Sequence, residues 1–286
     1  MAKLILGCGY LGQVVANHWL AADDHVVAVT RSAEKAARMA RAGIEPLVAD
    51  LNQSLVLPRR GGWETVLFSV GFDRTPGLTI EDVYLRGLQT AVNALNGEVG
   101  QLDYIRSTGV YGHTDGELVD ETAPCLPTRA GGKACLAAES WLVQQPVGER
   151  TTRLRLAGLY GPGRIPKLAA VVAGERLAGG GSLLNLIHRD DAAAVISAVE
   201  QQRLFPQLIN VADGCPVRRS AFYAELARLV AAPEVRFDAN LEPSRGIANK
   251  RIDTARLRRS VAVALQFPTY REGLQHSVEK SSQDPA

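Results

Sequence analysis

Short apolar runs and longer segments of helical periodicity alternate along the chain. Five runs rich in apolar and β-branched residues predict strands, at residues 2–6, 25–30, 45–50, 64–70 and 101–108. The segments between them carry apolar residues at helical spacing, as at Leu11, Val15 and Trp19. Two later runs, at residues 151–158 and 207–212, predict a sixth and a seventh strand. Strands that alternate with helices predict a parallel sheet covered on both faces, which is a doubly wound α/β fold.

Composition and charge exclude several classes of protein. The 286 residues are 46% hydrophobic and 22% charged, and 32 basic against 30 acidic residues leave a net charge of +2. Basic residues are scattered outside residues 250–260, so nucleic acid is not an expected partner. No apolar stretch has the form of a membrane span or a signal peptide, so we expect a cytoplasmic protein without membrane contact. The four cysteines lack metal-ligand spacing, so no metal site is predicted.

The motif GCGYLG, residues 7–12, follows the first predicted strand and opens the first predicted helix. In this context Gly7 permits a tight turn, Gly9 lets the backbone approach a pyrophosphate, and Gly12 allows close packing of the helix. The helix N-terminus adds N–H groups and a positive dipole. The motif predicts a Rossmann dinucleotide-binding site, and a glycine-rich turn without a ligand is the alternative. The predicted cofactor contacts on this side are Gly7, Gly9, Tyr10, Leu11, Gly12, Ser69 and Gly158.

The end of the second strand decides which dinucleotide is expected. An NAD site typically places a carboxylate there, roughly 20 residues after the glycines, whereas this strand ends in VTRS, residues 29–32. Arg31 can pair with a 2′-phosphate, and Ser32 can donate a hydrogen bond to it. The predicted cofactor is therefore NADP, with NAD as the alternative, and a solvated arginine is the alternative role of Arg31. Asp50, at the end of the third strand, is predicted to contact the adenine or to be an acidic turn residue.

The second half contains six ordered motifs. They are STGVYG (107–112), VDETAP (119–124), LRLAGLYGPGR (154–164), NLIHRDDAA (185–193), LINVADG (208–214) and YREGL (270–274). In this order they resemble landmarks of the extended short-chain dehydrogenase/reductases, the NAD(P)-dependent epimerase/dehydratase family. The resemblance covers almost the whole chain. It implies a Rossmann domain that binds the nicotinamide cofactor and a smaller C-terminal domain that closes over a substrate, often a nucleotide-sugar.

The domain boundaries follow from this resemblance and from local composition. We expect the Rossmann domain at residues 1–160 together with about 188–213. Residues 161–187 and 214–280 include stretches rich in Gly, Pro and Arg, and we expect them to form a smaller, discontinuous substrate-binding domain.

The family's catalytic set is a Ser or Thr after the fifth strand and a YxxxK motif on the following helix. Ser107 matches the hydroxyl, and Lys133 fits the lysine, which the resemblance also makes a cofactor-binding residue at the nicotinamide ribose, but the tyrosine position holds Arg129. An arginine cannot replace the phenol as acid/base, because it does not deprotonate in proteins. Tyr84 stands where relatives often have Asn, and it is the candidate replacement, with a packed tyrosine as the alternative. The predicted catalytic residues are therefore Ser107, Lys133 and Tyr84, and the chain resembles an atypical member of the family.

Other polar residues are weaker candidates. His188 is expected to hold the domain hinge, with Asp191 capping the next helix, and His113 to be structural. Arg164 and Arg251 lie in the expected substrate domain, where each can meet an anionic substrate or face solvent.

Three functions remain open on the sequence. The first is an NAD(P)-dependent oxidoreductase or epimerase/dehydratase that acts on a small molecule such as a nucleotide-sugar. The second is an inactive NADP-binding redox or ligand sensor, which the missing tyrosine favours. The third, a structural protein that binds no nucleotide, conflicts with the intact glycine motif. The helices at residues 84–95 and 131–143 are apolar enough to form a homodimer, although a core-facing stripe explains them equally well.

Overall fold

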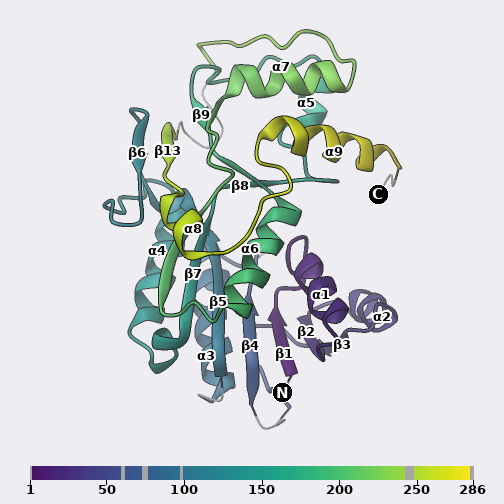
Figure 1. Ribbon diagram of the computed structural model, residues 1–286, viewed down its shortest axis with the longest axis vertical. Coiled ribbons are helices and arrows are strands. Elements are labelled where there is room, and N and C mark those ends of the chain that lie inside the picture. Colours follow the sequence, from purple (N-terminus) through teal and green to yellow (C-terminus); the bar gives the residue numbers. More distant parts are fainter. Residues whose placement is uncertain (1, 59–61, 73–76, 97–98, 242–247, 284–286) are drawn as a thin grey trace.

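The computed structural model describes residues 2–58, 62–72, 77–96, 99–241 and 248–283. Seven parallel strands form one sheet in the order β11-β7-β5-β4-β1-β2-β3 (Figure 1). They are β1 (Ala2–Leu6), β2 (Val26–Thr30), β3 (Glu45–Val48), β4 (Trp63–Phe68), β5 (Val99–Ser107), β7 (Thr151–Leu156) and β11 (Gln207–Val211). Each strand falls on one of the seven predicted runs, and the doubly wound α/β fold is confirmed.

Helices cover both faces of this sheet. One face is covered by α1 (Gly12–Ala21), α2 (Ala33–Arg41), α6 (Arg189–Gln201) and α8 (Ala255–Ser260). The other face is covered by α3 (Gly87–Leu95) and α4 (Ala130–Val143). Neighbouring strand residues point to opposite faces, so Ile105 joins the first core and Tyr104 the second. The apolar runs are therefore continuous because both faces of the sheet are buried.

The segment before β5, which the sequence predicts as a helix at residues 84–95, begins with a different kind of turn. Residues Asp82–Arg86 form a π-helical turn, η1, and α3 follows it directly. One carbonyl of this widened turn, that of Tyr84, accepts a hydrogen bond from Arg106. Two short 3₁₀ turns, η2 (Thr108–Val110) and η3 (Pro146–Arg150), follow β5 and α4.

A smaller second part lies at the opposite end of the molecule from the N-terminus (Figure 1). It contains α5 (Leu168–Val172), α7 (Arg219–Leu229) and α9 (Tyr270–Gln283), with the strand pairs β8 (Gly158–Tyr160) with β10 (Leu186–His188) and β9 (Leu183–Leu184) with β12 (Val217–Arg218). A further pair, β6 (Glu117–Val119) with β13 (Lys250–Ile252), lies beside it. The second part has a hydrophobic core of its own, which is centred on Tyr160, Phe222 and Leu274. The second part is discontinuous in sequence, because α6 and β11 return to the large sheet.

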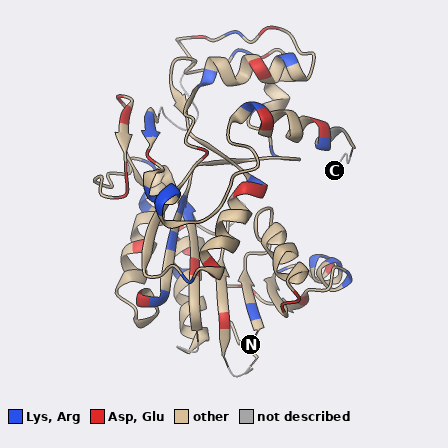
Figure 2. Ribbon diagram, viewed as in Figure 1, with Lys and Arg blue, Asp and Glu red and all other residues tan. Residues whose placement is uncertain are grey.

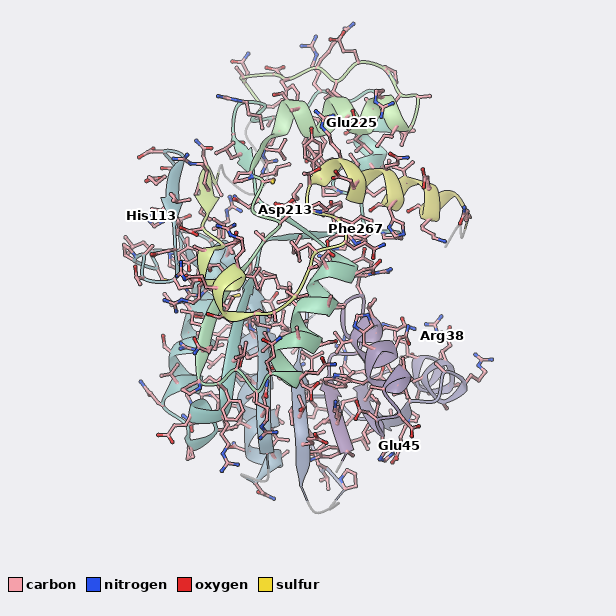
Figure 3. All side chains as sticks on the ribbon, viewed as in Figure 1. Arg38, Glu45, His113, Asp213, Glu225 and Phe267 are labelled. Atoms are coloured by element: carbon pink, nitrogen blue, oxygen red, sulfur yellow. The ribbon has the colours of Figure 1, made fainter. Side chains whose placement is uncertain are left out.

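The start of α6 joins the two parts, but not in the way that the sequence predicts. The helix is capped by His188, whose Nδ1 accepts from the Asp190 backbone N–H at 3.2 Å. Asp191 is not the cap. Its carboxylate accepts from the backbone N–H groups of Gln266 (2.6 Å) and Phe267 (3.0 Å), in the segment that leads into α9 (Figure 3). The buried Asp191 carboxylate, in the first turn of α6, thus holds the segment that leads into α9. Among the described helices, none is both long and apolar enough to cross a membrane.

Candidate active site

A cleft of about 1370 Å³ opens where the parallel strands end. Its sheet side is formed by residues that follow β1, β2, β3, β4, β5 and β7. Its other side is formed by residues 164–167, 175–178 and 219–223 of the second part. Open parallel sheets bind their ligands at this edge, where the strand order reverses. The cleft is therefore the candidate functional site.

The three glycines of the first loop have different surroundings. Gly7 has a φ of +94°, and a Cβ there would lie 2.7 Å from the Val70 nitrogen. A Cβ on Gly12 would lie 2.6 Å from the Gly7 oxygen, so these two positions require glycine. A Cβ on Gly9 would meet nothing within 4 Å. The loop is thus closed by packing at Gly7 and Gly12 and open to a ligand at Gly9.

Other predicted cofactor residues border the same loop. Ser69 donates from Oγ to the Gly7 carbonyl at 2.9 Å, which ties the end of β4 to the loop. Leu11 is buried at the start of α1, and Gly158, which follows β7, also lines the cleft. The Tyr10 ring lies between the guanidinium groups of Arg164 (5.4 Å) and Arg189 (5.0 Å), and burial raises its pKa to about 12. Tyr10 therefore links the glycine loop to the second part as a neutral phenol.

The end of β2 carries two cationic side chains. Arg31 and Lys35, one turn further along α2, both line the cleft. Ser32 caps α2, because its Oγ accepts from the Lys35 backbone N–H at 3.2 Å. Asp50 also lines the cleft and accepts from the Asn52 backbone N–H at 2.9 Å, which is the turn role considered for it. Lys35 was missed by sequence reasoning, and the signal for it is a position one helical turn after Arg31.

The predicted residues Ser107 and Tyr84 both line the cleft. Ser107 ends β5 and is exposed, and its Oγ accepts from the Gly109 N–H at 3.0 Å. Tyr84 belongs to η1 and is half-buried, and burial raises the pKa of its phenol. Cys135 of α4 lies beside them, and burial raises the pKa of its thiol although the Arg106 charge and the Ser107 backbone lower it.

Lys133 lies elsewhere. Its side chain is exposed and lines a separate depression of about 500 Å³ on the outer side of α4. Within the described part of the chain, the α4 residue that lines the cleft is Cys135, two positions later. Two positions turn a helix by roughly 200°, which explains why Lys133 points away. One turn before Cys135 stands Gly131, so neither a phenol nor an ammonium group occupies this face of α4.

Arg106, which sequence reasoning missed, is buried at the end of β5 directly before Ser107. Its Nε donates to the Tyr104 hydroxyl at 2.6 Å, and its Nη1 donates to the Ile105 carbonyl at 2.7 Å. Arg106 is also among the residues that line the cleft. No sequence motif indicates this side chain, because its contacts come from strands and turns that are distant along the chain.

Basic side chains dominate the lining of the cleft. They are Arg31, Lys35, Arg106, Arg129, Arg164, Lys167, Arg176 and Arg219, against the acidic Asp50 and Glu175. Eight minus two gives a formal charge of +6, whereas the whole chain carries +2. Elsewhere basic and acidic positions are intermixed over both parts (Figure 2). A concave surface with this excess concentrates anionic ligands.

Several other polar residues have structural roles. Tyr111 donates to Asn210 Oδ1 at 2.9 Å and accepts from Arg155 at 2.7 Å. Arg155 in turn forms a buried ion pair with Glu139 at 2.6 Å. Asp120 accepts from residues of its own turn, and Arg251 donates from Nε to the Gly116 carbonyl at 3.0 Å, outside the described lining of the cleft.

The seven-stranded parallel sheet with helices on both faces is a Rossmann-like fold. No protein-family model matches the chain. The chain is 29% identical over 273 residues to the protein YeeZ of Escherichia coli K12, which covers 92% of this chain and 95% of YeeZ.

Solved structures add a comparison of the fold. A protein of Methylobacillus flagellatus assigned as a NAD-dependent epimerase/dehydratase superposes with a TM-score of 0.76 at 27% identity, over 99% of each chain. The dTDP-glucose 4,6-dehydratase DesIV of Streptomyces venezuelae, solved with NAD and TYD, gives 0.80 at 18% identity, over 99% of this chain and 98% of that one. The similar structures are thus NAD-dependent epimerase/dehydratase proteins, and several of them hold NAD.

Proposed function

We propose that the cleft binds a nicotinamide dinucleotide and an anionic substrate side by side, and that the protein is an NAD(P)-dependent oxidoreductase or epimerase/dehydratase. One observation carries this proposal: the glycine loop, which is open at Gly9, and a wall rich in arginine line the same cleft. The similar structures that hold NAD support it. The domains proposed from the sequence then act as a cofactor domain and a substrate domain on either side of the cleft.

The residues present fit the dinucleotide at two points. The loop around Gly9 and the N-terminus of α1 would hold the pyrophosphate, since nothing crowds Gly9 and the helix end supplies N–H groups. Arg31, Lys35 and Ser32 would hold a 2′-phosphate, and Asp50 would contact the adenine. Two cations and no lining carboxylate at the end of β2 support NADP over NAD.

The second wall would hold the substrate. Arg164, Lys167, Arg176 and Arg219 line it, with Glu175 as the acidic residue among the described lining of that wall. Arginine recognises phosphate groups in a bidentate manner. A nucleoside diphosphate sugar fits this wall, and similar structures solved with UDP-glucose or TYD support that class of substrate.

The proposed chemistry depends on Ser107 and Tyr84. Hydride transfer is supplied by the nicotinamide when it is bound. Ser107, at the end of β5, would hydrogen-bond the reacting hydroxyl or carbonyl oxygen of the substrate. Tyr84 is neutral near neutral pH, because burial raises its pKa, so its phenol would donate a proton to that oxygen. Lys133 has no part in this proposal, since its side chain lies outside the cleft.

The test combines binding and turnover. Calorimetric titration of the protein with NADPH, and then with UDP-glucose and dTDP-glucose, should give binding of both ligand classes at once. Gly9→Asp should abolish dinucleotide binding while the matched Gly9→Ala retains folding, because a Cβ there meets nothing. If dinucleotide and nucleotide-sugar bind but a panel of sugars gives no nicotinamide absorbance change and no product, the protein is the inactive sensor. The Gly131 and Cys135 positions on α4 favour that second function.

We also propose a homodimer through the outer sides of α3 and α4. Leu126, which is 70% exposed, and Val143, which is 52% exposed, flank α4 on this side and support an apolar contact. Sedimentation velocity of the wild type and of Leu126→Glu tests it, and a monomer in both would contradict it.

A further inference from the structure

Arg106 carries a buried charge without a carboxylate partner among the described residues. It is 6% exposed, and its hydrogen bonds go to the Tyr104 hydroxyl and to the carbonyls of Ile105, Val70 and Tyr84. These four acceptors are neutral, so they take four of the five guanidinium N–H groups and leave its positive charge in place. Burying such a charge is costly, and an apolar side chain would fill the same space. This buried, unneutralised charge therefore indicates that Arg106 has a role beyond packing.

Three aromatic rings surround this guanidinium. Its carbon lies 4.3 Å from the ring centre of Tyr104, 4.7 Å from that of Tyr84 and 4.9 Å from that of Phe68. Aromatic faces attract a cation without neutralising it. We call Phe68, Tyr84 and Tyr104 the aromatic box. The box fixes a positive charge at the carboxyl end of β5, directly beside Ser107.

Tyr84 is held by Arg106 in two ways. The guanidinium lies against its ring, and Nη2 donates to its backbone carbonyl at 3.4 Å within the widened turn η1. π-helical turns of this kind often occur at functional sites. Both contacts act on the residue whose phenol lines the cleft, so Arg106 restricts the position of that phenol relative to Ser107.

The charge of Arg106 also acts on its titratable neighbours. It favours the ionised forms of the Tyr84 phenol and the Cys135 thiol, against burial, which raises the pKa of both. The next group along β5 is Ser107, whose hydroxyl is exposed to the cleft. The Arg106 charge therefore acts on two titratable groups that line the cleft, and Arg106 directly precedes Ser107 in β5.

We propose that Arg106 is a positioning residue that holds the Tyr84 phenol beside Ser107 and supplies the fixed positive charge of the reaction centre. The catalytic part of this inference rests on the proposed function. The Arg106–Tyr84 interaction itself does not, since it exists without any ligand. In this proposal the positive charge of the reaction centre comes from Arg106 on β5, whereas the sequence predicts that it comes from Lys133 on α4. The cation and the proton donor then come from neighbouring elements, β5 and η1, and not from one helix.

The experiment follows the Tyr84 phenol in the ligand-free protein. Incorporation of 3-fluorotyrosine gives one ¹⁹F resonance for each of the 7 tyrosines, and the signal lost in Tyr84→Phe identifies that residue. Its titration midpoint is then compared in the wild type, Arg106→Met and Arg106→Lys. We expect Arg106→Met to raise the midpoint by about one pH unit or more and Arg106→Lys to restore most of that change. An unchanged midpoint in Arg106→Met, or equal midpoints in the two variants, would overturn the proposal.

A second comparison covers the case in which Arg106→Met does not fold. Tyr104→Phe removes only the hydroxyl that accepts from Nε, whereas Phe68→Leu removes one face of the box. Both keep the charge. We expect the Tyr84 midpoint to stay within a few tenths of a pH unit of the wild type, with a broadened Tyr84 signal in Phe68→Leu. A large rise in midpoint in either variant would show that packing and not the charge governs the phenol. Absence of NADPH binding with an intact Arg106 effect would contradict the proposed function alone.

Discussion

Asp103→Asn should stabilise the protein increasingly as the pH rises from about 5 to about 8. Asp103 is fully buried in β5, and its Oδ1 accepts from Gln101 Nε2 at 2.8 Å. Burial and the nearby charge of Glu200 raise its pKa to about 8. Oδ2 of Asp103 and Oε2 of Glu200 are both buried without a partner in the described residues. A proton on Asp103 removes the negative charge that burial and Glu200 disfavour.

The sign follows from the two states. In the unfolded chain Asp103 ionises near its ordinary 3.8, whereas in the folded protein it keeps its proton up to about 8. The folded state thus binds one proton more in this window, so the stability of the wild type falls as the pH rises. Each pH unit is worth about 1.4 kcal/mol, so the upper limit from about pH 5 to about pH 8 is about 4 kcal/mol. Asparagine keeps the shape and an acceptor for Gln101 but does not ionise.

Urea unfolding at several pH values measures this difference. The buried Trp19 and Trp63 report unfolding by their fluorescence. The free energy of unfolding of Asp103→Asn minus that of the wild type should grow with pH in this window. Asp120→Asn is the matched control, because hydrogen bonds from Thr122 lower the Asp120 pKa and its effect should be constant there. A difference for Asp103→Asn that does not change with pH would refute the reasoning.

The remaining predictions concern the cleft and the buried ion pair. Arg31→Ala combined with Lys35→Ala should weaken NADPH binding far more than NADH binding, by at least about tenfold, and equal losses in a fluorescence titration would exclude a 2′-phosphate site there. Lys133→Ala should leave the dissociation constant of NADPH unchanged, whereas a loss would place that side chain in the cleft after all. Glu139→Ala leaves Arg155 buried and unpaired, so urea unfolding should show a loss of about 3–5 kcal/mol, and a loss below about 1 kcal/mol would mean that water reaches the pair.

The sequence predicts the sheet and the glycine loop well, because both depend on local patterns. Apolar runs bounded by turn residues fall on all seven strands, and the close approaches at Gly7 and Gly12 involve residues of the same βα unit and of β4. The position of Ser107 follows from the end of β5. These features need no knowledge of how distant segments pack.

The sequence does not predict which side chains reach the cleft where this depends on the rotation of a helix about its axis or on contacts between distant segments. Lys133 and Cys135 are two residues apart, and the packing of α4 against η1 and η2 decides which of them reaches the cleft. Arg106 owes its role to rings on β4, β5 and η1, and the cationic wall combines segments that are far apart in the chain. No periodicity in the sequence records these contacts.

The central claim is that the glycine loop, together with Arg31 and Lys35 at the end of β2, binds a nicotinamide dinucleotide. The most direct measurement is a titration of NADPH fluorescence with the wild type and with Gly9→Asp. The account predicts saturable enhancement with the wild type, tighter than with NADH, and none with Gly9→Asp. Absence of binding to the folded wild type, or equal binding to Gly9→Asp, would contradict it.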